Sequence, residues 1–212
     1  MENQSSFSDD EASQSEEEVG YEETEMNIDQ QEDDELSDLL IISLEQAVAA
    51  PYCGLLLASA GARVIKVERP EGDFARSYDN SINGKSAIFA WLNRGKESIS
   101  LDLKNKADKK IFKNMLKKAD VYLSNLTPGS LEKLELDYKQ VKALNPKLIF
   151  CEITGYGNSK LAHSKKAYDF LIQAESGLCS VTATEKYPSK VGISITDLST
   201  GLTAYSLSLI HI

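Results

Sequence analysis

Short apolar runs alternate with helix-like segments along residues 39–212, and this alternation constrains the fold more than any other feature of the chain. The apolar runs predict five buried strands, at residues 39–42, 64–68, 98–103, 121–123 and 148–154. The segments between them predict helices at residues 49–60, 106–119, 131–134 and 137–144. Strands that alternate with helices favour an α/β fold with a parallel sheet.

Polar side chains stand where four of these strands end, at Glu68, Asp102, Asn125 and Thr154. Ligands of parallel α/β sheets bind at the carboxyl ends of the strands, so we expect the functional site at this edge. The loop at residues 43–51 contains no glycine, and the chain has no GxxxxGK[ST] motif. The sequence therefore predicts neither a dinucleotide fingerprint nor a P-loop.

Acidic residues are concentrated at the amino terminus. Residues 1–38 hold 16 of the 33 acidic residues and no Lys or Arg, which leaves residues 39–212 with 17 acidic against 23 basic residues, a net charge of +6. A segment so charged and so poor in clustered apolar residues is predicted to be a disordered acidic tail, either a solvated extension or an interaction and phosphorylation segment. The basic remainder, residues 39–212, suits a polyanionic ligand.

Several classes of protein are excluded by what the chain lacks. Its three cysteines form no CxxC pair, and it has no HExxH motif, so we expect no disulfide framework and no metal site. The most apolar stretch, residues 39–62, is interrupted by Glu45, Gln46 and Pro51. Without a secretory signal or a visible transit peptide, the expectation is a soluble cytoplasmic protein with no membrane or nucleic-acid partner, although a mitochondrial location stays open.

Six stretches together resemble the class III (formyl-CoA transferase-like, CaiB/BaiF) CoA-transferases. They lie in the family's order and spacing, at residues 47–76, 91–104, 119–136, 145–157, 167–178 and 191–202. The resemblance implies a Rossmann-like parallel sheet that forms the amino-terminal part of the family's large domain. It also implies a coenzyme A thioester as substrate, with no permanently bound cofactor.

The resemblance implies that Asp197 is a covalent nucleophile. Family members carry that aspartate in the pattern Gly-x-x-x-x-Asp-x-x-x-Gly, which here runs from Gly192 to Gly201. The residues alone leave a second interpretation open, because Asp197 also stands before the helical run LSTGLTAYSLSL and would be a suitable helix cap.

Further positions match the family's CoA-binding residues. The resemblance places Ala47 and Val48 beside the adenine and Arg69 near the nucleotide. The strand ends that match the family's contacts to the phosphates and pantetheine are Leu101, Asp102, Leu103, Lys104, Asn125, Leu126 and Thr127. Lys133 stands where the family has Arg or Lys, and Lys166, Ala167, Tyr168 and Asp169 match the segment over the pantetheine. Taken singly, each lysine is also explained as a solvated surface residue.

The implied reaction moves CoA from an acyl-CoA to a small carboxylic acid through an aspartyl anhydride and an aspartyl-CoA thioester. The motifs look closest to the branch that acts on itaconate, mesaconate, citramalate or hydroxymethylglutarate, often with succinyl-CoA as donor. An α-methylacyl-CoA racemase is disfavoured, because Tyr168 stands where that enzyme has a catalytic histidine.

Family members are about twice as long as this chain and form interlocked homodimers. The resemblance therefore implies that a second domain is missing from residues 39–212. A truncated, non-catalytic CoA-binding remnant stays open as an alternative.

Overall fold

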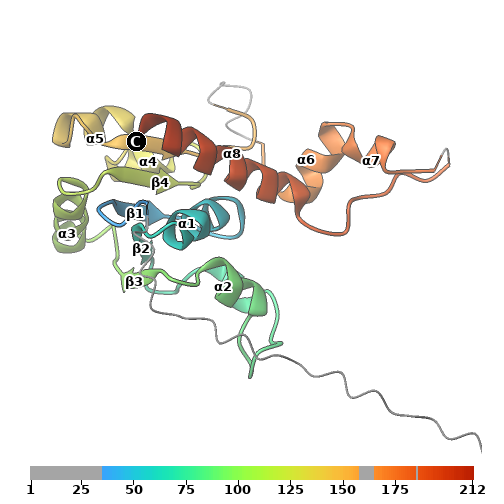
Figure 1. Ribbon diagram of the computed structural model, residues 1–212, viewed down its shortest axis with the longest axis horizontal. Coiled ribbons are helices and arrows are strands. Elements are labelled where there is room, and N and C mark those ends of the chain that lie inside the picture. Colours follow the sequence, from blue (N-terminus) through green and yellow to red (C-terminus); the bar gives the residue numbers. More distant parts are fainter. Residues whose placement is uncertain (1–34, 158–164, 185) are drawn as a thin grey trace, which may run out of the picture. The chain divides into compact units, whose positions relative to one another are not determined.

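The computed structural model describes residues 35–157, 165–184 and 186–212. Its centre is a five-stranded parallel sheet in the order β3-β2-β1-β4-β5 (Figure 1). The strands are β1 (Leu40–Leu44), β2 (Arg63–Glu68), β3 (Glu97–Ser100), β4 (Val121–Ser124) and β5 (Ile149–Glu152). The predicted α/β class and parallel sheet are therefore confirmed.

The strand order reverses at β1. The chain runs from β1 outward through β2 to β3, and then returns to place β4 on the other side of β1. Ile42 of β1 is consequently paired with Ile65 on one side and with Tyr122 on the other. Connections leave the sheet in opposite directions at such a point, which opens a crevice beyond the carboxyl ends of β1 and β4.

Helices cover both faces of the sheet (Figure 1). On one face α1 (Ala49–Ser59) and α8 (Ile195–His211) pack against each other and bury Ile41 and Val121. On the other face α3 (Lys106–Leu116), α4 (Ser130–Leu134) and α5 (Tyr138–Leu144) bury Ile42 and Tyr122. Successive residues of a strand point to opposite faces, so adjacent isoleucines serve two separate cores.

Helices α1 and α8 approach closely because Gly201 has no side chain. A Cβ atom at that position would lie 2.5 Å from the carbonyl oxygen of Ala49 and 3.0 Å from the ring of Tyr52. The glycine that ends the nucleophile pattern is thus a packing requirement of the fold.

The structure also contains elements that the apolar pattern did not predict. These are the 3-10 helix η1 (Phe74–Ser77) and the helices α2 (Ala87–Leu92), α6 (Asp169–Glu175) and α7 (Leu178–Val181). All are short, and α6 and α7 expose Phe170, Leu171 and Val181, so their apolar periodicity is weak. The predicted strands and helices are all present with shifted ends; the strand expected at residues 98–103 ends at Ser100.

The folded unit begins before residue 39. Residues 35–38 form a turn in which Leu36 is buried, and the Leu36 N–H donates to the Ala60 carbonyl at 3.1 Å. Residues 35–38 therefore lie in the folded unit, although the predicted tail extended to residue 38. The rest of the predicted tail, residues 1–34, lies outside the described residues. Across the described ranges, no helix has the length and apolarity that a membrane crossing requires.

Candidate functional site

A cavity of about 210 Å³ lies beyond the carboxyl ends of β1 to β4. Its walls come from the ends of the strands and the loops that follow them, which is the edge where the sequence predicted a site. Six predicted CoA-binding residues line it: Arg69, Leu101, Asp102, Leu103, Lys104 and Leu126. The side chains of Leu101 and Leu103 are buried and form its apolar wall, while the side chain of Arg69 is 58% exposed at its edge.

The turn between β1 and α1 is fixed by side chains from other parts of the sheet. The carboxamide of Asn125, which follows β4, accepts the Gln46 N–H at 2.9 Å and donates to the Gln46 carbonyl at 2.7 Å. Ala47 has a φ of +64° and donates its N–H to Asp73 Oδ1 at 3.2 Å. A left-handed alanine costs about 1 kcal/mol, so these contacts stabilise a strained turn next to the cavity.

Four buried charged side chains lie beneath this turn. Lys96 Nζ is 2.6 Å from Glu45 Oε1, Lys66 Nζ is 2.8 Å from Asp73 Oδ2, and Lys66 is 3.5 Å from Glu45. Although burial alone would raise the pKa of Glu45, the ammonium groups of Lys96 and Lys66 hold that pKa below its ordinary value. This cluster was not predicted from the sequence, where its only local signal is a lysine inside the apolar run VIKVE.

A second cluster fixes the loop after β2. Arg76 donates to both oxygens of Glu68, at 2.9 and 2.7 Å, and its guanidinium lies 3.9 Å from the centre of the Phe89 ring. Burial opposes ionisation of Glu68, but hydrogen bonds from Arg76, Ser98 and the Asp73 N–H lower its pKa to about 2. The loop that carries Arg69 is therefore held in one conformation.

Asp197 is the third residue of α8 and is half-buried. Burial first, and the negative charge of Asp169 second, raise the pKa of Asp197 to about 6. Tyr78 lies in the same environment, since burial and the charges of Asp73 and Asp197 raise its pKa to about 12. Tyr78 was not predicted as a site residue, and no pattern in the sequence points to it.

The capping interpretation of Asp197 is wrong. The cap position of α8 is Ser194, and within the described ranges no backbone N–H donates to the Asp197 carboxylate. Asp169, from α6, performs that role: its Oδ1 accepts the Thr196 N–H at 2.9 Å, the Thr196 hydroxyl at 2.6 Å and the Asp197 N–H at 3.4 Å.

The remaining predicted residues lie apart from the cavity wall. Val48 is buried at the start of α1, whereas Thr127 and Lys133 are exposed beyond β4. Lys166 and Tyr168 are exposed on the segment before α6. Ala167 is packed so closely on Gly155 that a Cβ atom at position 155 would clash with the Cβ atom of Ala167.

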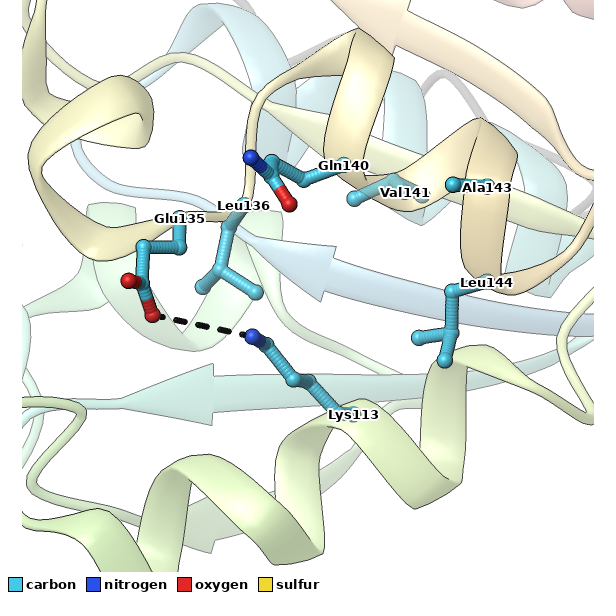
Figure 2. Close-up of a pocket in the computed structure, with 7 residues that line it drawn as sticks. All are labelled: Lys113, Glu135, Leu136, Gln140, Val141, Ala143 and Leu144. Carbon is cyan, nitrogen blue, oxygen red and sulfur yellow. Dashed lines mark ion pairs between the residues drawn. The ribbon is translucent and has the colours of Figure 1, made fainter.

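A second cavity, of about 230 Å³, lies between α3 and α5 and contains no predicted site residue (Figure 2). An ion pair of 3.8 Å between Lys113 and Glu135 crosses it, and Leu136, Gln140, Val141, Ala143 and Leu144 complete its lining. It lies away from the carboxyl ends of the strands, so the first cavity and Asp197 are taken as the candidate site. Within the described part of the chain, no group of three or more His, Cys, Asp or Glu side chains is arranged to hold a metal ion.

Comparison with known proteins agrees with this architecture. The model of CoA-transferase family III matches residues 36–209, and the chain therefore belongs to CoA-transferase family III. The chain is 38% identical over 186 residues to a succinate–glutarate CoA-transferase of Agrobacterium fabrum, an alignment that covers 83% of this chain and 46% of the relative. A succinyl-CoA:mesaconate CoA-transferase of Haloarcula hispanica is 36% identical, with 79% of this chain and 45% of the relative covered.

A solved structure shows the same arrangement. The crystal structure of a CAIB/BAIF family protein from Brucella suis superimposes with a TM-score of 0.79 and 35% identity, covering 84% of this chain and 48% of that one. The chain spans less than half the length of the curated relatives described here.

Proposed function

We propose that this chain supplies the acyl-CoA site and the nucleophile of a CoA-transferase, with Asp197 as the attacking carboxylate. The observation that carries the proposal is the environment of Asp197: a half-buried carboxylate in the first turn of α8, whose pKa is raised to about 6. A carboxylate that is more basic than usual is a stronger nucleophile, and it is still ionised at neutral pH. Its place in the family pattern from Gly192 to Gly201 supports this role.

The proposed reaction requires no change of oxidation state. An Asp197 oxygen attacks the thioester carbonyl of the donor, and the CoA thiolate leaves to give a mixed anhydride. The thiolate then attacks the Asp197 carbonyl, which releases the donor acid and leaves an aspartyl-CoA thioester. The acceptor carboxylate attacks this thioester to form a new anhydride, and the thiolate takes the acceptor acyl group and frees Asp197.

The first cavity is the proposed binding site for the CoA moiety. Arg69 and Lys104 line it and carry the positive charge that phosphate groups require, and both side chains reach solvent. The rigid turn at Gln46 and Ala47 borders the same space. Its backbone is proposed to pass the adenine, as the family resemblance implies.

A small dicarboxylate is the proposed acceptor and succinyl-CoA the proposed donor. The relatives support this choice, because two of them are named as CoA-transferases that combine succinate or succinyl-CoA with glutarate or mesaconate. The interlocked homodimer of the family is proposed as the working assembly, and residues 39–212 as part of its large domain.

A second candidate is a CoA-binding half that transfers nothing by itself. The observation in its favour is the exposed apolar surface of α8, where Leu202, Leu207, Leu209 and Ile210 are all more than a third exposed. A surface of this kind is suited to cover by another protein segment. In this candidate the chain binds CoA, and a further segment or chain completes the site.

Intact-mass measurement after mixing with succinyl-CoA tests the proposal. We expect a covalent acyl or CoA adduct on the unaltered chain and none on Asp197→Asn. The control Asp38→Asn changes an exposed aspartate in the turn at residues 35–38, and its adduct should be undiminished. No adduct from a folded chain that still binds CoA by calorimetry would refute transfer by this chain and support the second candidate. Deuterium incorporation at the α-carbon of an acyl-CoA in D₂O would instead indicate racemase chemistry.

A further inference from the structure

Gln173 is a wholly buried polar residue that the proposed chemistry leaves without a role. It lies in α6, and its side chain is 0% exposed. Its Nε2 donates to Asp169 Oδ2 at 2.7 Å and to the Ile193 carbonyl at 3.3 Å, while its Oε1 accepts the Val191 N–H at 2.8 Å. A buried amide is costly unless it is hydrogen-bonded, and this one is bonded at both ends.

These contacts join two segments that meet only in the tertiary structure. One end of the amide holds the carboxylate of Asp169 on α6, and the other end holds the backbone that leads into α8. The second oxygen of Asp169 holds the first turn of α8 through Thr196 and the Asp197 N–H. Gln173, Asp169 and the first turn of α8 thus form one continuous hydrogen-bonded chain that ends at the backbone of Asp197.

We propose that Gln173 is a positioning residue for the Asp197 carboxylate. By fixing Asp169 and the backbone of residues 191–193 to each other, it sets the orientation of the first turn of α8 and the distance between the two carboxylates. The inference rests on the proposed function only for the role of Asp197 as nucleophile. Gln173 itself touches no substrate.

The physical consequence is control of the basicity of Asp197. Among the described residues, the charge of Asp169 from α6 acts on Asp197, and the charge of Asp197 acts in turn on Tyr78, which follows η1 and is also near Asp73 and Tyr168. Burial and the nearby charge of Asp169 both raise the pKa of Asp197, so the position in which Gln173 holds Asp169 contributes to that pKa. If the α6–α8 junction loosens, Asp197 gains water and its carboxylate becomes a weaker base.

The test compares Gln173→Met with Gln140→Met, which changes an exposed glutamine of α5. Methionine keeps the length and volume of glutamine but removes the donor and the acceptor. The apparent pKa of Asp197 is measured by carbon-detected NMR titration of aspartate-labelled full chain, with Asp197→Asn to assign the signal. In Gln173→Met we expect this pKa to fall from about 6 toward the ordinary value of 3.8, with no shift in Gln140→Met.

Amide hydrogen exchange supplies a second measurement. The Val191 and Thr196 amides should lose at least about tenfold in protection in Gln173→Met, because each depends on the bonded chain, while amides of β1 and β4 keep theirs. If Gln173→Met fails to fold, the same measurement is made on Gln173→Glu, because a glutamate side chain has the same shape as glutamine. Its ionised carboxylate cannot donate to Asp169, so exchange at Val191 and Thr196 should rise with pH beyond the dependence of the unaltered chain.

An unchanged Asp197 pKa in a folded Gln173 variant would overturn the proposal, whatever the exchange shows, and so would a loss of folding in both Gln173 variants, which would make the residue a general stabiliser. Neither measurement depends on transfer. A missing adduct in the unaltered chain therefore refutes the proposed function alone, and an unmoved titration refutes the positioning role alone.

Discussion

Replacing Asp73 by alanine should destabilise this fold more than any exposed ion pair can. Asp73 is 6% exposed, and its Oδ2 lies 2.8 Å from Lys66 Nζ, an ammonium that is itself 1% exposed. Its other oxygen accepts the N–H groups of Ala47 and Ala75. Without Asp73 the buried Lys66 keeps the longer ion pair with Glu45, at 3.5 Å, and two backbone donors lose their acceptor.

The magnitude follows from burial. Breaking a buried ion pair by removing one partner costs about 3–5 kcal/mol, because the remaining charge is left without compensation in a region that water does not reach. The pair Arg63–Glu97 provides the contrast within the same molecule. Its contact is shorter, 2.6 Å, but its side chains are 61% and 56% exposed, and solvent screens such pairs so that they contribute little.

Urea denaturation at pH 7 measures both effects as free energies of unfolding. We expect Asp73→Ala to lose about 3–5 kcal/mol and Glu97→Ala to lose only a small fraction of that. A surface control, Asp79→Ala, should lose much less than Asp73→Ala, although Asp79 accepts the Ala87 N–H at the start of α2. Equal losses in Asp73→Ala and Glu97→Ala would refute the argument that burial, and not contact distance, sets the energy.

Three further predictions follow from the site and the packing. Adduct formation by the unaltered chain should rise with pH through about 6 and then level off, because Asp197 must be ionised to attack; a profile that is flat between pH 5 and 7 would contradict this. Gly201→Ala should lose about 1–3 kcal/mol in urea denaturation because the new Cβ meets the α1 backbone, whereas Gly192→Ala, with open space around it, should lose much less. Arg69→Ala should weaken CoA binding by calorimetry without changing stability, and Arg94→Ala, exposed and outside the cavity lining, should leave binding unchanged.

The raised pKa of Asp197 also makes the free energy of unfolding depend on pH. Its folded pKa of about 6 lies above the ordinary value of 3.8, so the native state binds the proton more tightly than the unfolded chain does. Asp197 therefore disfavours folding increasingly as pH rises from 3.8 to about 6, and the effect is complete above that pH. Asp197→Asn should remove this part of the pH dependence, as denaturation at pH 4 and pH 7 can show.

The strands and the main helices were predictable from local pattern, and the sheet edge predicted to hold the site is lined by a cavity. The apolar run VIKVE and the apolar spacing of α3 involve residues only a few positions apart. Such local patterns can be read directly from the sequence. The parallel sheet and the binding edge at the strand ends follow from the strand–helix alternation. The family resemblance likewise rests on motifs whose order is visible in the sequence.

Only the tertiary structure determined which partners the polar side chains have. Glu45 and Lys96 are 51 positions apart, and Asp169 and Thr196 are 27 apart, so no periodicity relates them. Asp197 looked like a helix cap because a carboxylate before a helical run usually is one, yet the helix begins earlier and Asp169 takes that role. Burial and long-range hydrogen bonding depend on where the whole chain places each group, and those contacts determine the charge and basicity of the proposed nucleophile.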